Sequence, residues 1–121
     1  MRRIAVIDDD PNMRDMLRIH LSAIGLAVET FVDASTGIRS ILENPPDLLV
    51  LDLLLPDLGG LEVLQAVKGD AATKHVRVVV LTSRTDDETF AQAKRLGADA
   101  FLTKPIKREE LIEGVLNQLY S

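Results

Sequence analysis

The sequence contains no cysteine and no tryptophan, and only one tyrosine and three phenylalanines. The absence of cysteine excludes a disulfide framework and thiol chemistry. No apolar run approaches the roughly 20 residues that a membrane-spanning helix requires. Arg2 and Arg3 are not followed by the long apolar segment of a signal peptide. We therefore expect no membrane association and a cytoplasmic location.

Positive charge is also scarce, since 14 lysines and arginines stand against 19 aspartates and glutamates, for a net charge of −5. Nucleic-acid binding depends on neutralising phosphates with lysine and arginine, so this balance argues against such binding by these residues alone. The hydrophobic content of 46% is ordinary for a globular protein. Because the chain has no repeat, low-complexity segment or linker, we expect a single domain over residues 1–121.

What the sequence does contain is a regular alternation of short apolar runs and helical segments. We expect strands at residues 4–7, 27–31, 48–51, 76–81 and 100–102, and helices at residues 11–24, 34–43, 61–68, 86–96 and 107–119. A strict (βα)5 order predicts a parallel sheet with helices on both faces, because the crossover connections are right-handed. A closed eightfold barrel would need about twice this length.

Local signals mark where two of the helices begin. Asp10 followed by Pro11 is typical of a helix start, since aspartate caps the free N–H groups and proline suits the first turn. Thr85 with Glu88 has the spacing of a capping box for the helix after the fourth strand.

Four of the apolar runs lead into residues that can take part in phosphate or metal chemistry. These residues are Asp8, Asp9, Asp52, Thr82 and Lys104. Ligands of open α/β sheets bind outside the carboxyl ends of the strands, so we expect the five side chains to meet in one pocket. An acid at a strand end often only caps the next helix. Asp10 and Thr85 already fill that role, and no helix begins directly after Asp52, so a shared site is the better interpretation.

Three carboxylates in one crevice repel one another, which raises their pKa values and destabilises the metal-free fold. A divalent cation removes this penalty, and an all-oxygen ligand set selects a hard ion such as Mg²⁺ or Mn²⁺. The Lys104 ammonium and the Thr82 hydroxyl then suit phosphate oxygens. Because the sequence has no glycine-rich phosphate loop, we do not expect a bound nucleotide. A carboxylate that is itself phosphorylated remains as the interpretation.

In this order, the motifs resemble the receiver domain of two-component response regulators. The matching segments are Ile7 to Asp10, Leu51–Asp52 with Pro56 and Gly59–Gly60, Leu81 to Ser83, and Phe101 with Lys104–Pro105. The resemblance covers the whole chain. It implies the flavodoxin-like (CheY-like) fold, a doubly wound (βα)5 three-layer sandwich with a five-stranded parallel sheet of order 2-1-3-4-5.

The resemblance implies a role for each acid. Asp52 matches the phosphoacceptor, which takes a phosphoryl group from a sensor histidine kinase or a phosphotransfer protein. Asp9, Asp52 and the main-chain carbonyl of Leu54 match the direct ligands of Mg²⁺, and Asp8 matches a residue that acts largely through water. Bulky Leu54 stands where water must enter, so we expect it to slow hydrolysis of the phosphorylated form.

Thr82 and Lys104 match the hydroxyl and the ammonium that contact phosphoryl oxygens, and family members often hold the bond from this lysine to Pro105 in cis. After phosphorylation Thr82 would move toward the phosphoryl group and Phe101 would turn inward. This movement would reshape the surface of the fourth helix, fifth strand and fifth helix. Many members carry tyrosine in place of Phe101, so we expect weaker or altered coupling here. Gly60 is expected to allow a backbone conformation that a side chain would strain.

Two other functions fit parts of the pattern. A haloacid-dehalogenase-type phosphatase also uses Mg²⁺ and an aspartyl phosphate, but it needs a second aspartate where this chain has Leu54. A pseudo-receiver would bind partners without being phosphorylated, and the complete set of site residues argues against it. We expect a monomeric receiver that is not a conventional enzyme and acts through a partner or output domain. Phe90 either completes the core or lies exposed as a partner contact.

Overall fold

The computed structural model describes residues 1–55, 57 and 59–120, and its elements alternate strictly between strand and helix. The strands are β1 (Arg3–Ile7), β2 (Ala27–Phe31), β3 (Leu48–Leu51), β4 (Arg77–Thr82) and β5 (Ala100–Thr103). The helices are α1 (Pro11–Ser22), α2 (Ala34–Glu43), α3 (Gly60–Gly69), α4 (Asp87–Arg95) and α5 (Arg108–Leu119). Each predicted element is present, with boundaries shifted by no more than a residue or two. No helix within the described part of the chain has the length and apolar character of a membrane span.

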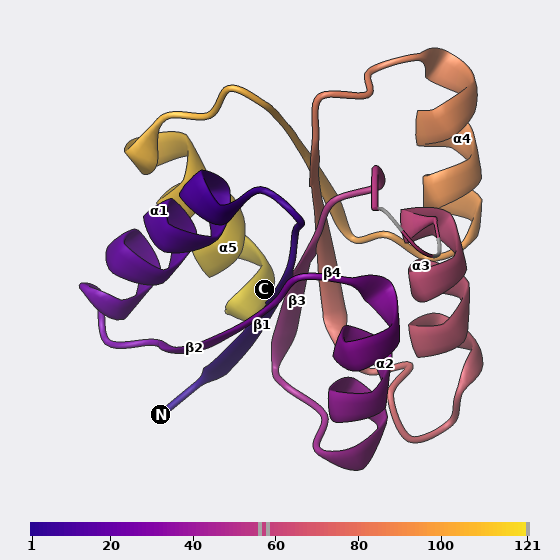
Figure 1. The fold of residues 1–121 in the computed structure, drawn as a ribbon, viewed down its shortest axis with the longest axis horizontal. Helices are drawn as coiled ribbons and strands as arrows, with labels where there is room; N and C mark the ends of the chain where they lie inside the picture. Colours follow the sequence, from indigo (N-terminus) through magenta and orange to yellow (C-terminus); the bar gives the residue numbers. More distant parts are fainter. Residues whose placement is uncertain (56, 58, 121) are drawn as a thin grey trace.

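All five strands run parallel in one sheet of order β2-β1-β3-β4-β5, as predicted. Figure 1 shows α1 and α5 on one side of this sheet and α2, α3 and α4 on the other. Because helices cover both faces, every residue of β3 is buried, which accounts for its unbroken apolar sequence. The doubly wound three-layer sandwich is therefore confirmed.

Each face of the sheet has its own hydrophobic cluster. On the side of α1 and α5 the cluster includes Ile4, Val6, Leu17, Leu21, Leu111 and Val115. On the opposite side it includes Ala5, Ile7, Ile41, Val63, Leu64 and Val67. Successive residues of β1 alternate between the two clusters because side chains along a strand point to opposite faces. Each fully buried leucine or isoleucine contributes about 1.5–3 kcal/mol, so the two clusters stabilise the sheet from both faces.

The first helix begins as predicted. The N–H of Asn12 donates to Asp10 Oδ1 at 3.0 Å, and Pro11 occupies the first turn of α1.

The predicted capping box of Thr85 and Glu88 at the start of α4 is wrong. Asp86 is the cap residue, and one of its carboxylate oxygens accepts from the Thr89 N–H at 3.1 Å and from the Thr89 hydroxyl at 2.7 Å. Arg84 Nε also donates to this carboxylate, at 3.0 Å. Aspartate is a stronger cap than threonine, and here it stands directly before the first helical residue.

Gly60 is needed for close packing, not for an unusual backbone angle. Among the described glycines only Gly25 and Gly97 have a positive φ. A Cβ at Gly60 would overlap the Cα of Leu53 and lie 2.5 Å from the carbonyl oxygen of Asp52. The start of α3 can therefore approach the end of β3 only because Gly60 has no side chain. The expectation that Gly60 permits a strained backbone conformation is thus wrong.

We expect Gly60→Ala to lower the free energy of unfolding by about 1–3 kcal/mol, the usual cost of overpacking a tight contact. Urea denaturation measures this change. Gly69→Ala is the matched control, because a Cβ there meets no atom within 4 Å. Equal stability of the two variants would contradict this account of Gly60.

The Thr89 hydroxyl, together with Arg84, lowers the pKa of the Asp86 carboxyl to about 2. A carboxyl with a lower pKa in the folded state stabilises the fold above its unfolded pKa, near 4, and loses this effect as pH falls toward 2. We therefore expect Asp86→Ala to lower the Tm at pH 7, with a narrower gap to the wild type at pH 3. Thermal denaturation followed by circular dichroism measures both gaps, and a gap of the same size at both pH values would refute the prediction.

Candidate functional site

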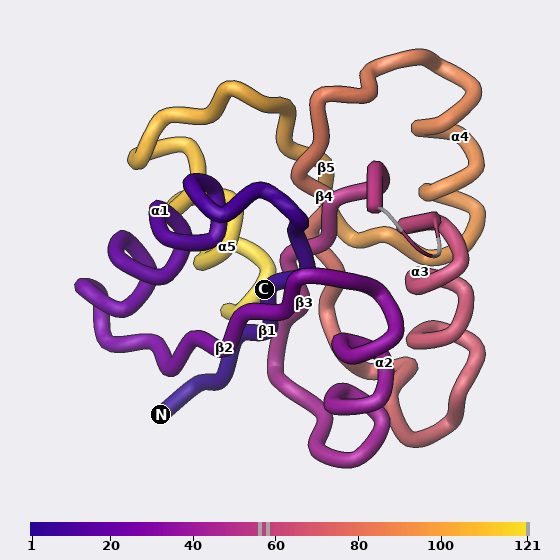
Figure 2. Tube along the Cα trace, viewed as in Figure 1, coloured from indigo at the N-terminus to yellow at the C-terminus, as the bar shows by residue number. Residues whose placement is uncertain are grey.

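The chain connections that leave β1, β3, β4 and β5 lie toward the same end of the sheet (Figure 2). Asp8 directly follows β1 and Asp52 directly follows β3, while Thr82 is the last residue of β4 and Lys104 directly follows β5. The parallel fold therefore gathers the predicted residues at one edge, although they come from distant parts of the sequence.

Asp8, Asp9 and Asp52 form an acidic cluster, in which one carboxylate oxygen of each residue lies within 4.8 Å of the others. Asp8 and Asp52 are buried, with 2% and 5% of their surface exposed, whereas Asp9 is exposed. Main-chain bonds fix the two buried acids: the Asp52 N–H donates to the Ile7 carbonyl at 3.0 Å, and the Asp10 N–H donates to Asp8 Oδ1 at 2.9 Å. The cluster thus has a buried floor and one exposed acid.

Lys104 provides the ammonium that joins this cluster. Its Nζ donates to Asp8 Oδ2 at 2.8 Å and to Asp52 Oδ2 at 2.9 Å, and only 16% of its side chain is exposed. Its N–H donates to the carbonyl of Thr82 at 3.0 Å, and its bond to Pro105 is cis, as expected. Lys104 is therefore the internal counter-ion of two buried carboxylates.

Three carboxylates and one ammonium leave the site with a formal charge of −2. Burial raises the pKa of Asp8, although hydrogen bonds from Lys104 and Asp10 oppose this effect. Burial disfavours the charged form of Lys104, but its bonds to Asp8 and Asp52 outweigh burial and raise its pKa. A divalent cation would balance the remaining charge, and carboxylate oxygens are the donors that Mg²⁺ and Mn²⁺ prefer. The cluster therefore fits such an ion.

Thr82 is fully buried at the end of β4, and its Oγ1 accepts from the Arg84 N–H at 3.2 Å. On β5 the half-buried Phe101 ring packs edge-to-face against Phe90 of α4, with ring centroids 5.3 Å apart and an interplanar angle of 73°. Phe90 is thus a packing partner of Phe101, and this pair joins β5 to α4.

The Leu54 N–H donates to Asp52 Oδ1 at 3.0 Å, so its main chain lies beside the predicted acceptor. Leu54 itself is 46% exposed, so it is an apolar residue at the surface. Pro56, which belongs to the motif after Asp52, lies outside the described residues.

One residue with clear contacts near the site was not predicted. The Asp57 carboxylate accepts hydrogen bonds from the N–H groups of Ala34 and Ser35 at the start of α2. These partners are 23 and 22 residues away in the sequence, so no local pattern around Asp57 could indicate the contact.

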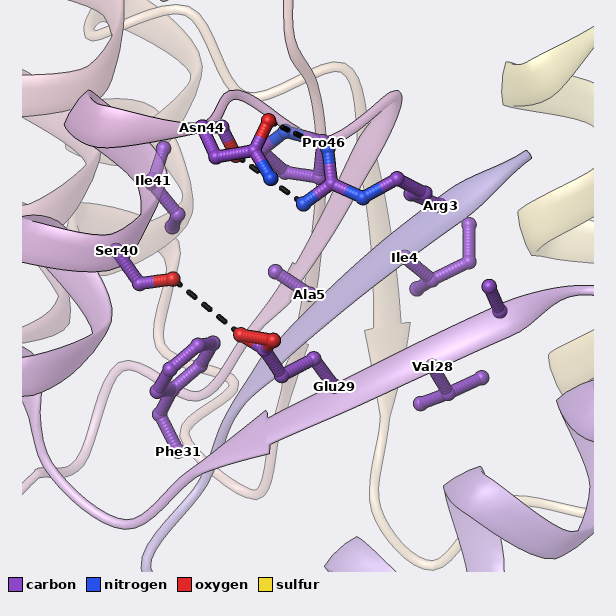
Figure 3. A pocket seen from close by; sticks show the side chains of 11 residues that line it. Arg3, Ile4, Ala5, Val28, Glu29, Phe31, Ser40, Ile41, Asn44 and Pro46 are labelled. Atoms are coloured by element: carbon purple, nitrogen blue, oxygen red, sulfur yellow. Dashed lines mark hydrogen bonds between the residues drawn. The ribbon is translucent and has the colours of Figure 1, made fainter. Parts of the chain in front are cut away.

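A separate pocket lies where α2 covers β1 and β2 (Figure 3), and none of the predicted site residues lines it. Its polar groups are paired with one another: Ser40 Oγ donates to Glu29 Oε1 at 3.3 Å, and Arg3 donates to Asn44 Oδ1 at 3.3 Å. The acidic cluster at the sheet edge remains the candidate site.

The sequence is similar to known proteins over most of its length. The family model of the response regulator receiver domain matches residues 4–116 of this chain. The chain is 38% identical over 112 residues to the transcriptional regulatory protein KdpE of Mycobacterium tuberculosis, covering 93% of this chain and 48% of that protein. It is 36% identical over 118 residues to the DNA-binding response regulator MtrA of Mycolicibacterium smegmatis, covering 98% and 50%. The chain therefore spans about half the length of these curated relatives.

Solved structures agree over nearly the whole chain. The chemotaxis protein CheY4 of Vibrio cholerae has a TM-score of 0.91 and 26% identity, covering 97% of this chain and 98% of that one. The BeF3-activated DrrB receiver domain has a TM-score of 0.90 and 32% identity, covering 100% and 99%. With the family match over most of its length and this shared fold, the chain belongs to the response regulator receiver domain family.

Proposed function

We propose that this chain is a phosphorylatable receiver in which Asp52 accepts a phosphoryl group from the phosphohistidine of a sensor histidine kinase or a phosphotransfer protein. The observation that supports this most is the Lys104 ammonium, which lies between Asp8 and Asp52 at 2.8 and 2.9 Å, with Asp9 in the same cluster. Metal-assisted transfer to an aspartate needs an acceptor carboxylate, a fixed ammonium group and two further acids.

Asp9, Asp52 and the main-chain carbonyl of Leu54 would hold Mg²⁺, and Mn²⁺ is an alternative ion of similar preference. Asp8 would act largely through water. The bound ion would supply positive charge to the carboxylates and to the phosphoryl oxygens.

The Asp52 carboxylate would attack phosphorus in line with the leaving imidazole, so an oxygen–phosphorus bond forms as the nitrogen–phosphorus bond breaks. Asp52 is already positioned, since Lys104 contacts Oδ2 and the Leu54 N–H contacts Oδ1. An ionised carboxylate needs no general base, so the protein contributes positioning and charge stabilisation. Lys104 and the Thr82 hydroxyl would each contact a phosphoryl oxygen.

The proposed switch connects this chemistry to a surface. Thr82 would move toward the phosphoryl group, and Phe101 would turn inward. Because Phe101 packs against Phe90 at 5.3 Å, its movement would affect α4 as well as β5. The surface of α4, β5 and α5 would then control an output domain or a separate protein partner. The receiver would act as a monomer in the cytoplasm.

Incubation with acetyl phosphate and Mg²⁺ should add one phosphoryl group to the wild-type chain, as measured by intact-mass spectrometry. Chelation of the metal should abolish the adduct, because the carboxylates would then lack their cation. Asp52→Asn should gain no adduct. A wild-type chain that binds Mg²⁺ but never gains the adduct would instead support the pseudo-receiver function, and an adduct that persists in Asp52→Asn would place the acceptor elsewhere.

Leu54 is half-exposed and its main chain lies beside the Asp52 carboxylate, so we expect its side chain to hinder the water that hydrolyses the acyl phosphate. We expect Leu54→Asn to shorten the lifetime of the phosphorylated form several-fold, measured as decay of the adduct mass. Leu42→Asn is the matched control, because Leu42 is 40% exposed on α2 and makes no part of the site. Equal decay rates for the wild type and Leu54→Asn would refute the role of Leu54.

A further inference from the structure

The first turn of α2 depends on two aspartates from different parts of the chain. Asp33, the cap residue, accepts from the N–H of Thr36 at 2.9 Å and from its hydroxyl at 2.6 Å. The N–H groups of Ala34 and Ser35 donate instead to Asp57, each at 3.0 Å, and the Ser35 hydroxyl adds a third bond at 2.7 Å. Because the first N–H groups of a helix have no partner within it, Asp57 satisfies two donors that Asp33 leaves free.

Asp57 belongs to the chain segment between β3 and α3, which also carries Leu54. At its beginning this segment is held by the Leu54 N–H, which donates to Asp52 Oδ1 at 3.0 Å. Near α3 it is held by the Gly60 N–H, which donates to the Leu53 carbonyl at 3.1 Å. Asp57 adds an attachment to α2, a neighbouring helix on the same face of the sheet (Figure 1). Asp57 thus joins the segment beside the acceptor to a separate helix.

We propose that Asp57 is a positioning residue for the metal site, which acts by fixing the β3–α3 segment to α2 and so holding the Leu54 main chain beside Asp52. This inference rests on the proposed function, in which the Leu54 carbonyl is a metal ligand. Removal of Asp57 would break three hydrogen bonds between the segment and α2, and Leu54 would then be less fixed relative to the acidic cluster. Mutation of a residue that orients a metal ligand commonly lowers the metal affinity by about 10–100-fold.

The coupling must also act in the opposite direction, because linkage between two binding events is reciprocal. An ion that fixes Leu54 would favour the conformation in which Asp57 is bonded to α2. Mg²⁺ should therefore protect the N–H groups of Ala34 and Ser35, which donate to Asp57, more than the N–H of Thr36, which donates to Asp33.

A Mg²⁺ titration followed by amide chemical shifts in NMR tests the proposal in three chains: wild type, Asp57→Ala and Asp33→Ala. Each variant lacks one of the two carboxylates that accept hydrogen bonds from the first turn of α2. Only Asp57→Ala also releases the β3–α3 segment. We expect the dissociation constant for Mg²⁺ to rise about tenfold in Asp57→Ala and to stay at the wild-type value in Asp33→Ala. Asp57→Asn keeps an acceptor for the N–H of Ala34 or Ser35. Its dissociation constant for Mg²⁺ should therefore lie between those of the wild type and Asp57→Ala.

Hydrogen exchange of the wild-type chain provides a test that does not depend on the folding of a variant. Mg²⁺ should slow exchange at Ala34 and Ser35 several-fold more than at Thr36. Equal Mg²⁺ affinity in Asp57→Ala and the wild type, or equal protection of the three amides, would overturn the role of Asp57 and leave the proposed function intact. Absence of Mg²⁺ binding by the wild type would overturn the proposed metal site, and this inference with it.

Discussion

The ion pair of Lys104 with Asp8 and Asp52 is the interaction on which the candidate site depends. Its two hydrogen bonds join residues 96 and 52 positions apart in the sequence, and in doing so they tie together the ends of β1, β3 and β5. Loss of one partner from a buried ion pair costs about 3–5 kcal/mol, because a charge is left without compensation. The lysine therefore allows two carboxylates to be buried side by side at the sheet edge.

The same pair leaves the site with uncompensated negative charge. Lys104 compensates one of three negative charges, and burial raises the pKa of Asp8 although the hydrogen bonds from Lys104 and Asp10 oppose this effect. We propose that a divalent cation and a phosphoryl group would redistribute these charges, with Lys104 moving from carboxylate to phosphoryl oxygen. Two contacts lead away from the site: Phe101 reaches α4 through Phe90, and Asp57 reaches the start of α2. These contacts connect the sheet edge to two neighbouring helices.

Most of the fold could be predicted from the sequence because its signals are local or follow from topology. An unbroken apolar run predicts the buried strand β3, and parallel order alone places Asp52 and Lys104 at the same edge. Other features depend on contacts that no local pattern contains. The role of Gly60 depends on how closely α3 approaches Leu53. The contact of Asp57 with α2 likewise exists only in the folded chain.

We propose that Lys104 and a divalent cation compensate the same carboxylates. Thermal denaturation of Lys104→Met and wild type, each with and without Mg²⁺, tests this most directly. We expect the variant to have the lower Tm without the metal, because Asp8 and Asp52 lose their counter-ion, and to gain more from Mg²⁺ than the wild type does. An equal Mg²⁺-induced rise in Tm for both chains would contradict the claim, since it would show that the lysine and the cation act on different groups.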